Sequence, residues 1–204
     1  MRRVRAPVFA IVFLGLTAAL PAHADSIDFK MQSEDQVWPG KIQAGFRPFG
    51  VGVTYGVNNS NAWYRLDVDF EYLVYPLMKD WDIWAGGAIG YGVGSYGSVA
   101  SNGFITSYVV SELQPSLFAM LTMNIFRIPV VPFVKAGGVF DLLWMGYGSY
   151  AGGGLLVGGG VTYWLFHNFG ASVETEFVFG ASGSPSGAGF WGSWLFQLGA
   201  RAAF

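Results

Sequence analysis

Charged side chains fall on every second residue in one stretch of the chain, from Ala62 to Pro76. Arg65, Asp67, Asp69 and Glu71 share one parity. The residues of the other parity are large and apolar or aromatic: Tyr64, Leu66, Val68, Phe70, Tyr72 and Val74. Because successive side chains of a strand point to opposite faces, the pattern predicts a strand with one charged and one apolar face. A half-buried strand of a soluble protein alternates in the same way, with its charged face outside.

The composition separates these two interpretations. The chain is 52% hydrophobic and only 12% charged, yet after residue 24 it contains no uninterrupted apolar run of 18 residues. A helix needs roughly 20 apolar residues to span a bilayer, so an ordinary helical membrane protein is excluded. The other structure that satisfies its backbone polar groups inside lipid is a closed barrel.

Strand-like alternation recurs along the chain. The segments are 40–55, 62–76, 82–94, 111–124, 131–143, 154–166, 169–179 and 191–204. Their lengths suit tilted strands in which ~9–11 residues span the bilayer and a few more residues extend beyond it at either end. We therefore expect an all-β fold, an eight-stranded antiparallel up-and-down transmembrane β-barrel. Eight strands enclose an interior only just wide enough for side chains.

Charge parity indicates which face is the interior. In each segment with two or more central charges, those charges share a parity, and Arg or Lys at the lipid midplane would cost ~2–4 kcal/mol. Glycines such as Gly90 and Gly158 share the same face and suit a narrow lumen. The predicted lumen charge network is Lys41, Arg47, Arg65, Asp67, Asp69, Glu71, Glu112, Lys135, Asp141, Glu174, Glu176 and Arg201.

We expect these charges to form a salt-bridge network that blocks the barrel, because an isolated buried ion costs several kcal/mol. Folding the first hairpin about residue 58 or 59 brings Arg47 opposite Asp69 or Phe70, which predicts an Arg47–Asp69 pair. The sharper alternative is a catalytic carboxylate pair, for which so narrow a barrel leaves little room. The parity of the first segment changes after Arg47, so a bulge near Pro48 or Gly50 is expected.

The connections alternate in kind. Short turns at Leu77–Trp81, Phe126–Pro129 and His167–Asn168 are assigned to the periplasm. Longer Gly- and Ser-rich links at Gly56–Asn61, Ser95–Val109, Trp144–Gly153 and Gly180–Gly189 are expected to be exposed loops. Aromatic residues near segment ends are candidates for the two interfacial girdles. They are Trp63, Tyr75, Trp81, Trp144, Tyr163 and Trp191.

The N-terminus has the pattern of an export signal. Three arginines precede an apolar run, and Ala22-His23-Ala24 is a small-x-small cleavage pattern, so residues 1–24 are expected to be a cleaved signal peptide. Residues 25–39 are expected to form a short periplasmic segment and residues 40–204 the barrel. Cleavage leaves 8 basic against 13 acidic residues with no basic cluster, which argues against nucleic acid as a partner. No cysteine is present, so no disulfide framework exists.

At the C-terminus, the chain ends in "QLGARAAF", and Gly158–Phe177 reads "GGGVTYWLFHNFGASVETEF". With these stretches, the whole chain after residue 24 resembles the small eight-stranded outer-membrane barrels of Gram-negative bacteria, the group that includes the membrane domain of outer-membrane protein A and the opacity-type adhesins. The resemblance implies an assembly signal at Gln197, Gly199, Ala202 and Phe204. It also implies export to the bacterial outer membrane, contact with its lipid and lipopolysaccharide, and handling by the barrel-assembly machinery.

Three functions follow as hypotheses. The first is a small barrel with an occluded lumen, serving the envelope structurally or binding a surface ligand through its loops. The second is a narrow channel for small or apolar solutes. The third is a lipid A-modifying enzyme, which would need a histidine beside a serine at the outer rim. The one histidine after residue 24 is His167, in a predicted periplasmic turn near an inward Ser172, so we expect no catalytic residues, and likewise no cofactor and no metal.

Overall fold

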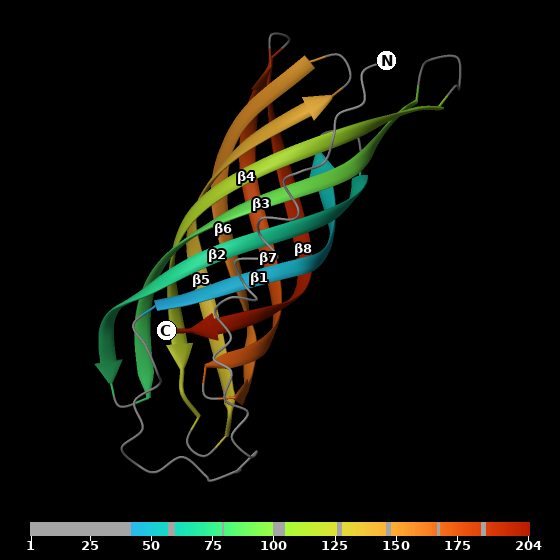
Figure 1. Ribbon diagram of the computed structural model, residues 1–204. Coiled ribbons are helices and arrows are strands. Elements are labelled where there is room, and N and C mark those ends of the chain that lie inside the picture. The colour runs from blue at the N-terminus through green and yellow to red at the C-terminus, as the bar shows by residue number, and fades with distance from the viewer. Residues whose placement is uncertain are drawn as a thin grey trace. The chain divides into compact units, whose positions relative to one another are not determined.

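Eight antiparallel strands pair in sequence order, and the last closes on the first. The structure, a computed structural model, describes residues 42–56, 60–78, 80–99, 105–125, 128–145, 148–166, 168–184 and 187–204. The strands are β1 (Ile42–Gly56), β2 (Ser60–Met78), β3 (Trp81–Val99), β4 (Ile105–Met123), β5 (Val130–Met145), β6 (Gly148–Phe166), β7 (Phe169–Ser184) and β8 (Gly187–Ala203). β1 pairs with both β2 and β8, so the sheet is a closed barrel (Figure 1). The predicted fold class is confirmed.

Alternation places the two kinds of side chain on opposite faces of the wall. Along β2, Arg65, Asp67 and Asp69 are buried inside the barrel, whereas Tyr64 and Phe70 are exposed on its outer surface. The outer surface carries large exposed hydrophobic residues on all eight strands. The barrel therefore has its apolar face outside and its charged face inside, the reverse of a soluble barrel.

A bulge in β1 resolves the parity change of that strand. The register of β1 shifts between Arg47 and Gly50 against β2, and between Phe46 and Phe49 against β8. Arg47 and Gly50 face inward, whereas Phe49 lies outside with 73% of its surface exposed. The predicted bulge is confirmed at Pro48–Phe49, where proline removes a ladder donor and is tolerated.

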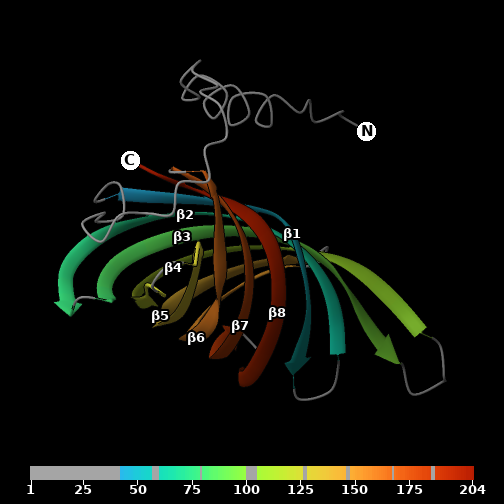
Figure 2. The ribbon, with the colours of Figure 1, turned by 90° about the horizontal axis from the view of Figure 1, so that it is seen from below.

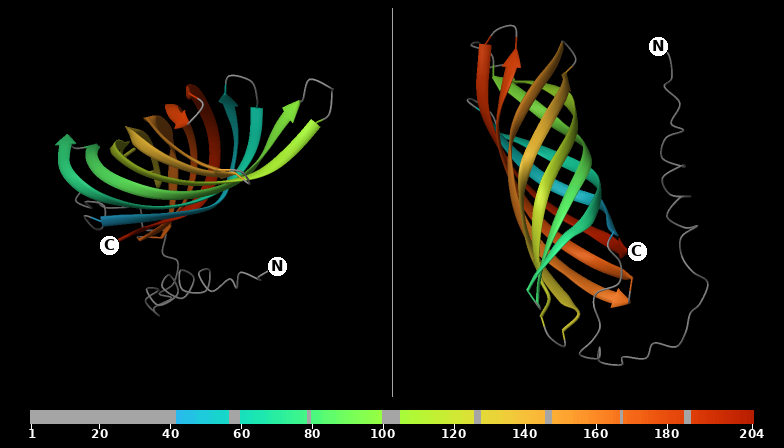
Figure 3. Two further views of the ribbon diagram at one scale, coloured as in Figure 1. Left: turned by 90° about the horizontal axis from the view of Figure 1, so that it is seen from above. Right: turned by 90° about the vertical axis from the view of Figure 1, so that its left-hand side faces the viewer.

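All strands except β1 are longer than predicted, and the eight strands have 15 to 19 residues. Most of Ser95–Val109, Trp144–Gly153 and Gly180–Gly189 was expected to be loop, and this is wrong because β3–β4, β5–β6 and β7–β8 stay paired through these segments. Their Gly and Ser residues favour turns locally, but the ladder on either side overrides that preference. The β3–β4 hairpin extends past its neighbours, as the views in Figures 2 and 3 show.

The turns at the other end lie where they were expected, between β2 and β3, β4 and β5, and β6 and β7. None of the described residues forms a helix long and apolar enough to cross a membrane. Among the girdle candidates, Tyr75, Trp144 and Tyr163 are exposed on the outer face, and Trp81 is partly exposed. Trp191 contradicts the prediction: it has inward parity and packs against the interior cluster of Val139, Leu156 and Val178. The side chain of Trp63 lies outside the described residues.

Candidate functional site: the charged barrel interior

The interior of the barrel contains eleven of the twelve residues of the predicted charge network. They are Arg47, Arg65, Asp67, Asp69, Glu71, Glu112, Lys135, Asp141, Glu174, Glu176 and Arg201, all buried. Lys41 lies outside the described residues. Because each residue has inward parity on its strand, closure of the sheet is sufficient to bring charges from β1, β2, β4, β5, β7 and β8 into one lumen.

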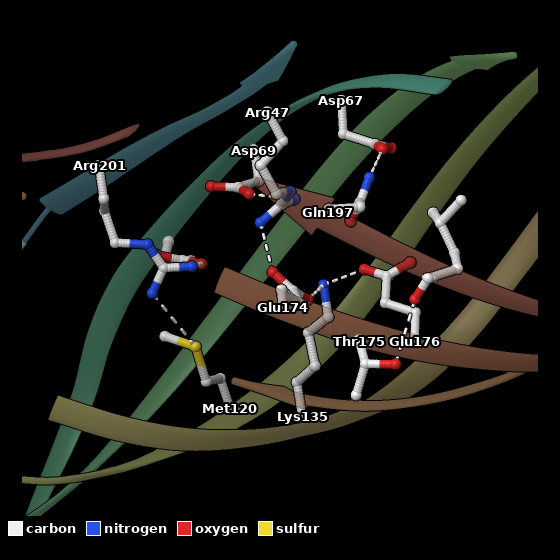
Figure 4. A network of polar contacts seen from close by, with 12 residues as sticks. Arg47, Asp67, Asp69, Met120, Lys135, Glu174, Thr175, Glu176, Gln197 and Arg201 are labelled. Atoms are coloured by element: carbon white, nitrogen blue, oxygen red, sulfur yellow. Dashed lines mark hydrogen bonds and ion pairs between the residues drawn. The ribbon is translucent and has the colours of Figure 1, made fainter. Parts of the chain in front are cut away.

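The central group joins opposite walls of the barrel through two cations. Arg47 on β1 forms an ion pair with Asp69 on β2, and its Nη1 lies 2.7 Å from Glu174 Oε2 on β7 (Figure 4). Lys135 on β5 pairs with both Glu174 and Glu176. Glu174 thus receives a guanidinium from one wall and an ammonium from another, and the contacts cross the lumen rather than following the ladder.

A second group surrounds Arg65 on β2. Arg65 Nη2 lies 2.7 Å from Asp67 Oδ1, and Arg65 also donates to the side-chain oxygen of Gln114 on β4. Gln114 Nε2 donates to Glu112 Oε1 at 2.8 Å, and Gln197 on β8 donates to Asp67. The two amide side chains therefore extend the Arg65–Asp67 ion pair to β4 and β8, and hydrogen bonds in such a buried network are electrostatically stronger than in water.

A third group centres on Arg201 near the C-terminal end of β8. Its Nη2 lies 3.0 Å from Glu71 Oε1, and its Nη1 lies 3.8 Å from the sulfur of Met120. The guanidinium carbon lies 4.8 Å from the centre of the Phe133 ring. One carboxylate and two soft, polarisable neighbours therefore surround this charge.

Apolar residues fill parts of the interior beside these groups. Trp84, Phe118, Met120 and Phe133 form one buried cluster, and Val131, Trp164 and Ala203 form another. The indole N–H of Trp84 donates to Thr122 Oγ1 at 3.1 Å, so the buried ring keeps its polar atom paired.

Glycines on the inner face make room for the charged side chains. A Cβ at Gly90 would overlap Arg65 and Asp67, one at Gly45 would overlap Asp69, and one at Gly199 would overlap Arg47. The space left by the missing glycine side chain on one strand is thus filled by a charged side chain from the adjacent strand. This accounts for the many inward glycines of a barrel with so little internal room.

Acidic groups outnumber cations in this interior. Among the described buried side chains, four cations face seven carboxyl groups. In the described chain, Glu71 Oε2, Asp141 Oδ1 and Glu176 Oε2 accept no hydrogen bond. The described residues contain no group of three or more Asp, Glu or His arranged to hold a metal ion.

Two features of the site differ from the sequence prediction. The β1–β2 register places Arg47 opposite Asp67, not Asp69 or Phe70, so the Arg47–Asp69 ion pair is diagonal. Gln114 was missed altogether, although its parity matches that of Glu112 and would have placed it in the lumen. His167, the residue that the enzyme hypothesis needs, lies outside the described residues, and Ser172 is buried inside.

The C-terminal residues of the predicted assembly signal alternate across the wall. Gln197 is fully buried in the lumen, and Gly199 packs against Arg47. Ala202 pairs with Ala44 of β1, and Phe204 is exposed and exchanges backbone hydrogen bonds with Ile42. These residues thus form the seam at which the barrel closes.

Comparisons with known proteins identify this architecture. The crystal structure of Neisserial surface protein A superimposes with a TM-score of 0.57 at 15% identity, covering 80% of this chain and 96% of that one. The outer-membrane protein OprG from Pseudomonas aeruginosa gives a TM-score of 0.51 at 12% identity, covering 81% and 97%. No protein-family model and no curated protein matches the sequence. The chain has the fold of small outer-membrane barrels.

Proposed function

We propose that this protein is a small barrel of the bacterial outer membrane whose interior is closed by an ion-pair network. In this proposal it serves the envelope structurally or binds partners at its surface, and it does not act as an open pore. The single observation that carries the proposal is the inverted arrangement of polarity: every strand exposes large apolar side chains on the outside, and six strands bury charged side chains on the inside.

The outer surface supports the membrane location. Leu117 has 75% of its surface exposed and Leu155 has 68%, and such residues recur around the whole wall. A soluble monomer rarely exposes contiguous apolar area beyond a few hundred Å². Every backbone polar group in lipid also needs an internal partner, a requirement that a closed ladder meets except where proline interrupts it.

The pattern of contacts supports closure of the lumen. Arg47, Glu174 and Lys135 meet from β1, β7 and β5, so their side chains cross the interior instead of lining it. A second level, formed by Arg65, Gln114 and Gln197, repeats this arrangement. Breaking one buried ion pair would leave an uncompensated charge inside the barrel. The free-energy cost of that charge keeps the network intact once it has formed.

Two further parts of the proposal concern export. Residues 1–24 act as a cleaved signal, and the seam formed by Gln197, Gly199, Ala202 and Phe204 is read by the barrel-assembly machinery. The surrounding lipid then includes lipopolysaccharide in the outer leaflet. We retain the expectation that the protein is not an enzyme.

Conductance in a planar lipid bilayer tests the closed lumen. The purified mature protein is expected to insert without lasting single-channel steps. The Arg47→Ala variant removes the guanidinium that joins Asp69 and Glu174, and it is expected to raise the leak measurably. Leu198→Ala, which changes the outer face of β8, serves as the matched control and is expected to leave the recording silent.

Lasting conductance of the unchanged protein would favour the narrow channel instead. If the protein stays silent and Arg47→Ala leaks no more than Leu198→Ala, the network is not what closes the barrel.

A further inference from the structure

A groove of about 710 Å³ lies on the outer face of the barrel wall across β2 to β5. It exists because two outward positions, Gly87 and Gly138, carry no side chain between the exposed rings and side chains of Phe70, Leu117 and Phe140. A Cβ built at Gly138 would meet nothing nearer than a backbone oxygen at 3.8 Å. This position therefore opens directly into the groove.

Proline interrupts the backbone ladder beside the groove. Pro115 is in the middle of β4 and lines the groove together with Phe140 of β5. The β4–β5 register is the same above and below this point, yet the pairs at Gln114 and Pro115 are missing. Both missing pairs are explained if Pro115 and Phe140 lie opposite each other as a hydrogen-bonded pair, in which each residue would donate its N–H to the carbonyl of the other. Proline has no N–H to donate, so one of these two hydrogen bonds cannot form.

The Phe140 carbonyl therefore has no backbone donor in β4, although it lies in a wall that faces lipid. An unsatisfied backbone carbonyl in hydrocarbon costs several kcal/mol. A plain acyl chain fills an apolar groove but offers no donor. A hydroxyl group on that chain would supply one.

We propose that this groove binds a membrane lipid whose acyl chain carries a hydroxyl group near its middle. The chain lies over Gly87 and Gly138, and its hydroxyl donates to the Phe140 carbonyl. The mid-strand position of Pro115 selects a mid-chain hydroxyl over one next to the headgroup. This inference rests on the proposed function, since it requires the barrel wall to be in a bilayer.

Competition between lipids tests the inference. Folded protein is mixed with equal amounts of two phosphatidylcholines, one with a 12-hydroxystearoyl chain and one with a stearoyl chain, and retained lipid is counted by native mass spectrometry. One hydrogen bond in this setting predicts a preference of roughly three- to tenfold for the hydroxylated lipid. A 2-hydroxystearoyl lipid is expected to show no such preference.

Three variants separate the parts of the site. Pro115→Val restores the N–H, so the carbonyl is paired within the ladder and the preference is expected to fall to about one. Gly138→Leu fills the groove without meeting the backbone, and it is expected to reduce retention of both lipids. Gly192→Leu, at an equally open position on β8, is the matched control and is expected to behave like the unchanged protein.

Equal retention of the two lipids by the unchanged protein would overturn the inference, as would an undiminished preference in both Pro115→Val and Gly138→Leu. Insertion into vesicles is measured in parallel. A protein that inserts and shows no preference refutes only the lipid site, whereas a protein that does not insert refutes the proposed function.

Discussion

Arg201 shows how a single charge is accommodated inside the wall. The parity of the last strand places it in the lumen, as the sequence predicts, but the sequence does not reveal its partner. Glu71 lies on β2 and Arg201 on β8, on either side of β1 in the closed sheet, and the pair is diagonal: the β1 residue opposite Arg201 is Gly45, whereas Gln43 lies opposite Glu71. Which pairs form thus depends on the stagger of the closed barrel, which no local pattern contains.

The Arg201–Glu71 pair offers a double-mutant test, because it is the one ion pair of Arg201 among the described residues. Glu71→Met leaves a buried guanidinium without a carboxylate and is expected to cost ~3–5 kcal/mol in the free energy of unfolding. Adding Arg201→Met removes that charge beside Met120 and Phe133, and most of the loss is expected to be recovered. Urea unfolding of the protein in vesicles measures both, and losses that simply add would contradict the pairing.

At the level of the strand, the alternation of polar and apolar residues predicted which side chains face inward and which face outward, but it did not predict the residues at which the strands end. The conflict of parity in the first segment was enough to predict the bulge at Pro48. The predicted partner of Arg47 was wrong by two or three residues, because the centre of the first turn could not be read from a run of Asn and Ser and because the bulge itself shifts the register by one. Gly- and Ser-rich stretches such as Ser95–Val99 suggested loops, yet they continue a strand once a paired neighbour is present.

Inward glycines give the strand-level prediction. Gly90→Val on β3 is expected to push Arg65 and Asp67 apart and to lower the free energy of unfolding by ~1–3 kcal/mol, as overpacking does. The control is Gly192→Val on β8, where a new Cβ would meet its nearest neighbour, Phe179, at 3.8 Å. The denaturant midpoint of each variant is compared with that of the unchanged protein. Equal midpoints for the two variants would show that the charged network does not need the space that Gly90 leaves.

For the whole molecule, the number of strands and their closure could be predicted because a bilayer permits no open sheet edge. The task of the protein could not be predicted, since the apolar outer face and the charged lumen bear on where the chain lies and not on what it does there. The structure adds the length of the strands. At 15 to 19 residues they exceed the ~9–11 that span the hydrocarbon, so in the proposed location the barrel extends well beyond the membrane.

This excess length predicts which hairpins reach the medium outside the cell. A peptide tag inserted between residues 101 and 102, in the segment that connects β3 to β4, is expected to bind antibody on intact Gram-negative cells. A tag in the segment that connects β2 to β3 is expected to bind only after the outer membrane is permeabilised. The reverse labelling would show that the barrel is inserted upside down.

The inverted polarity of the wall is the central claim, and single-cysteine scanning along β2 tests it most directly. The chain has no cysteine of its own, so each introduced thiol can carry one spin label. In vesicles, labels at Val68, Phe70 and Tyr72 are expected to collide with oxygen dissolved in lipid, whereas labels at Asp67, Asp69 and Glu71 are expected to be shielded from lipid. A soluble barrel would give the opposite result. Labels at Asp67, Asp69 and Glu71 would then be accessible to a water-soluble relaxation agent, labels at Val68, Phe70 and Tyr72 would be shielded from that agent and from oxygen, and the account would be contradicted.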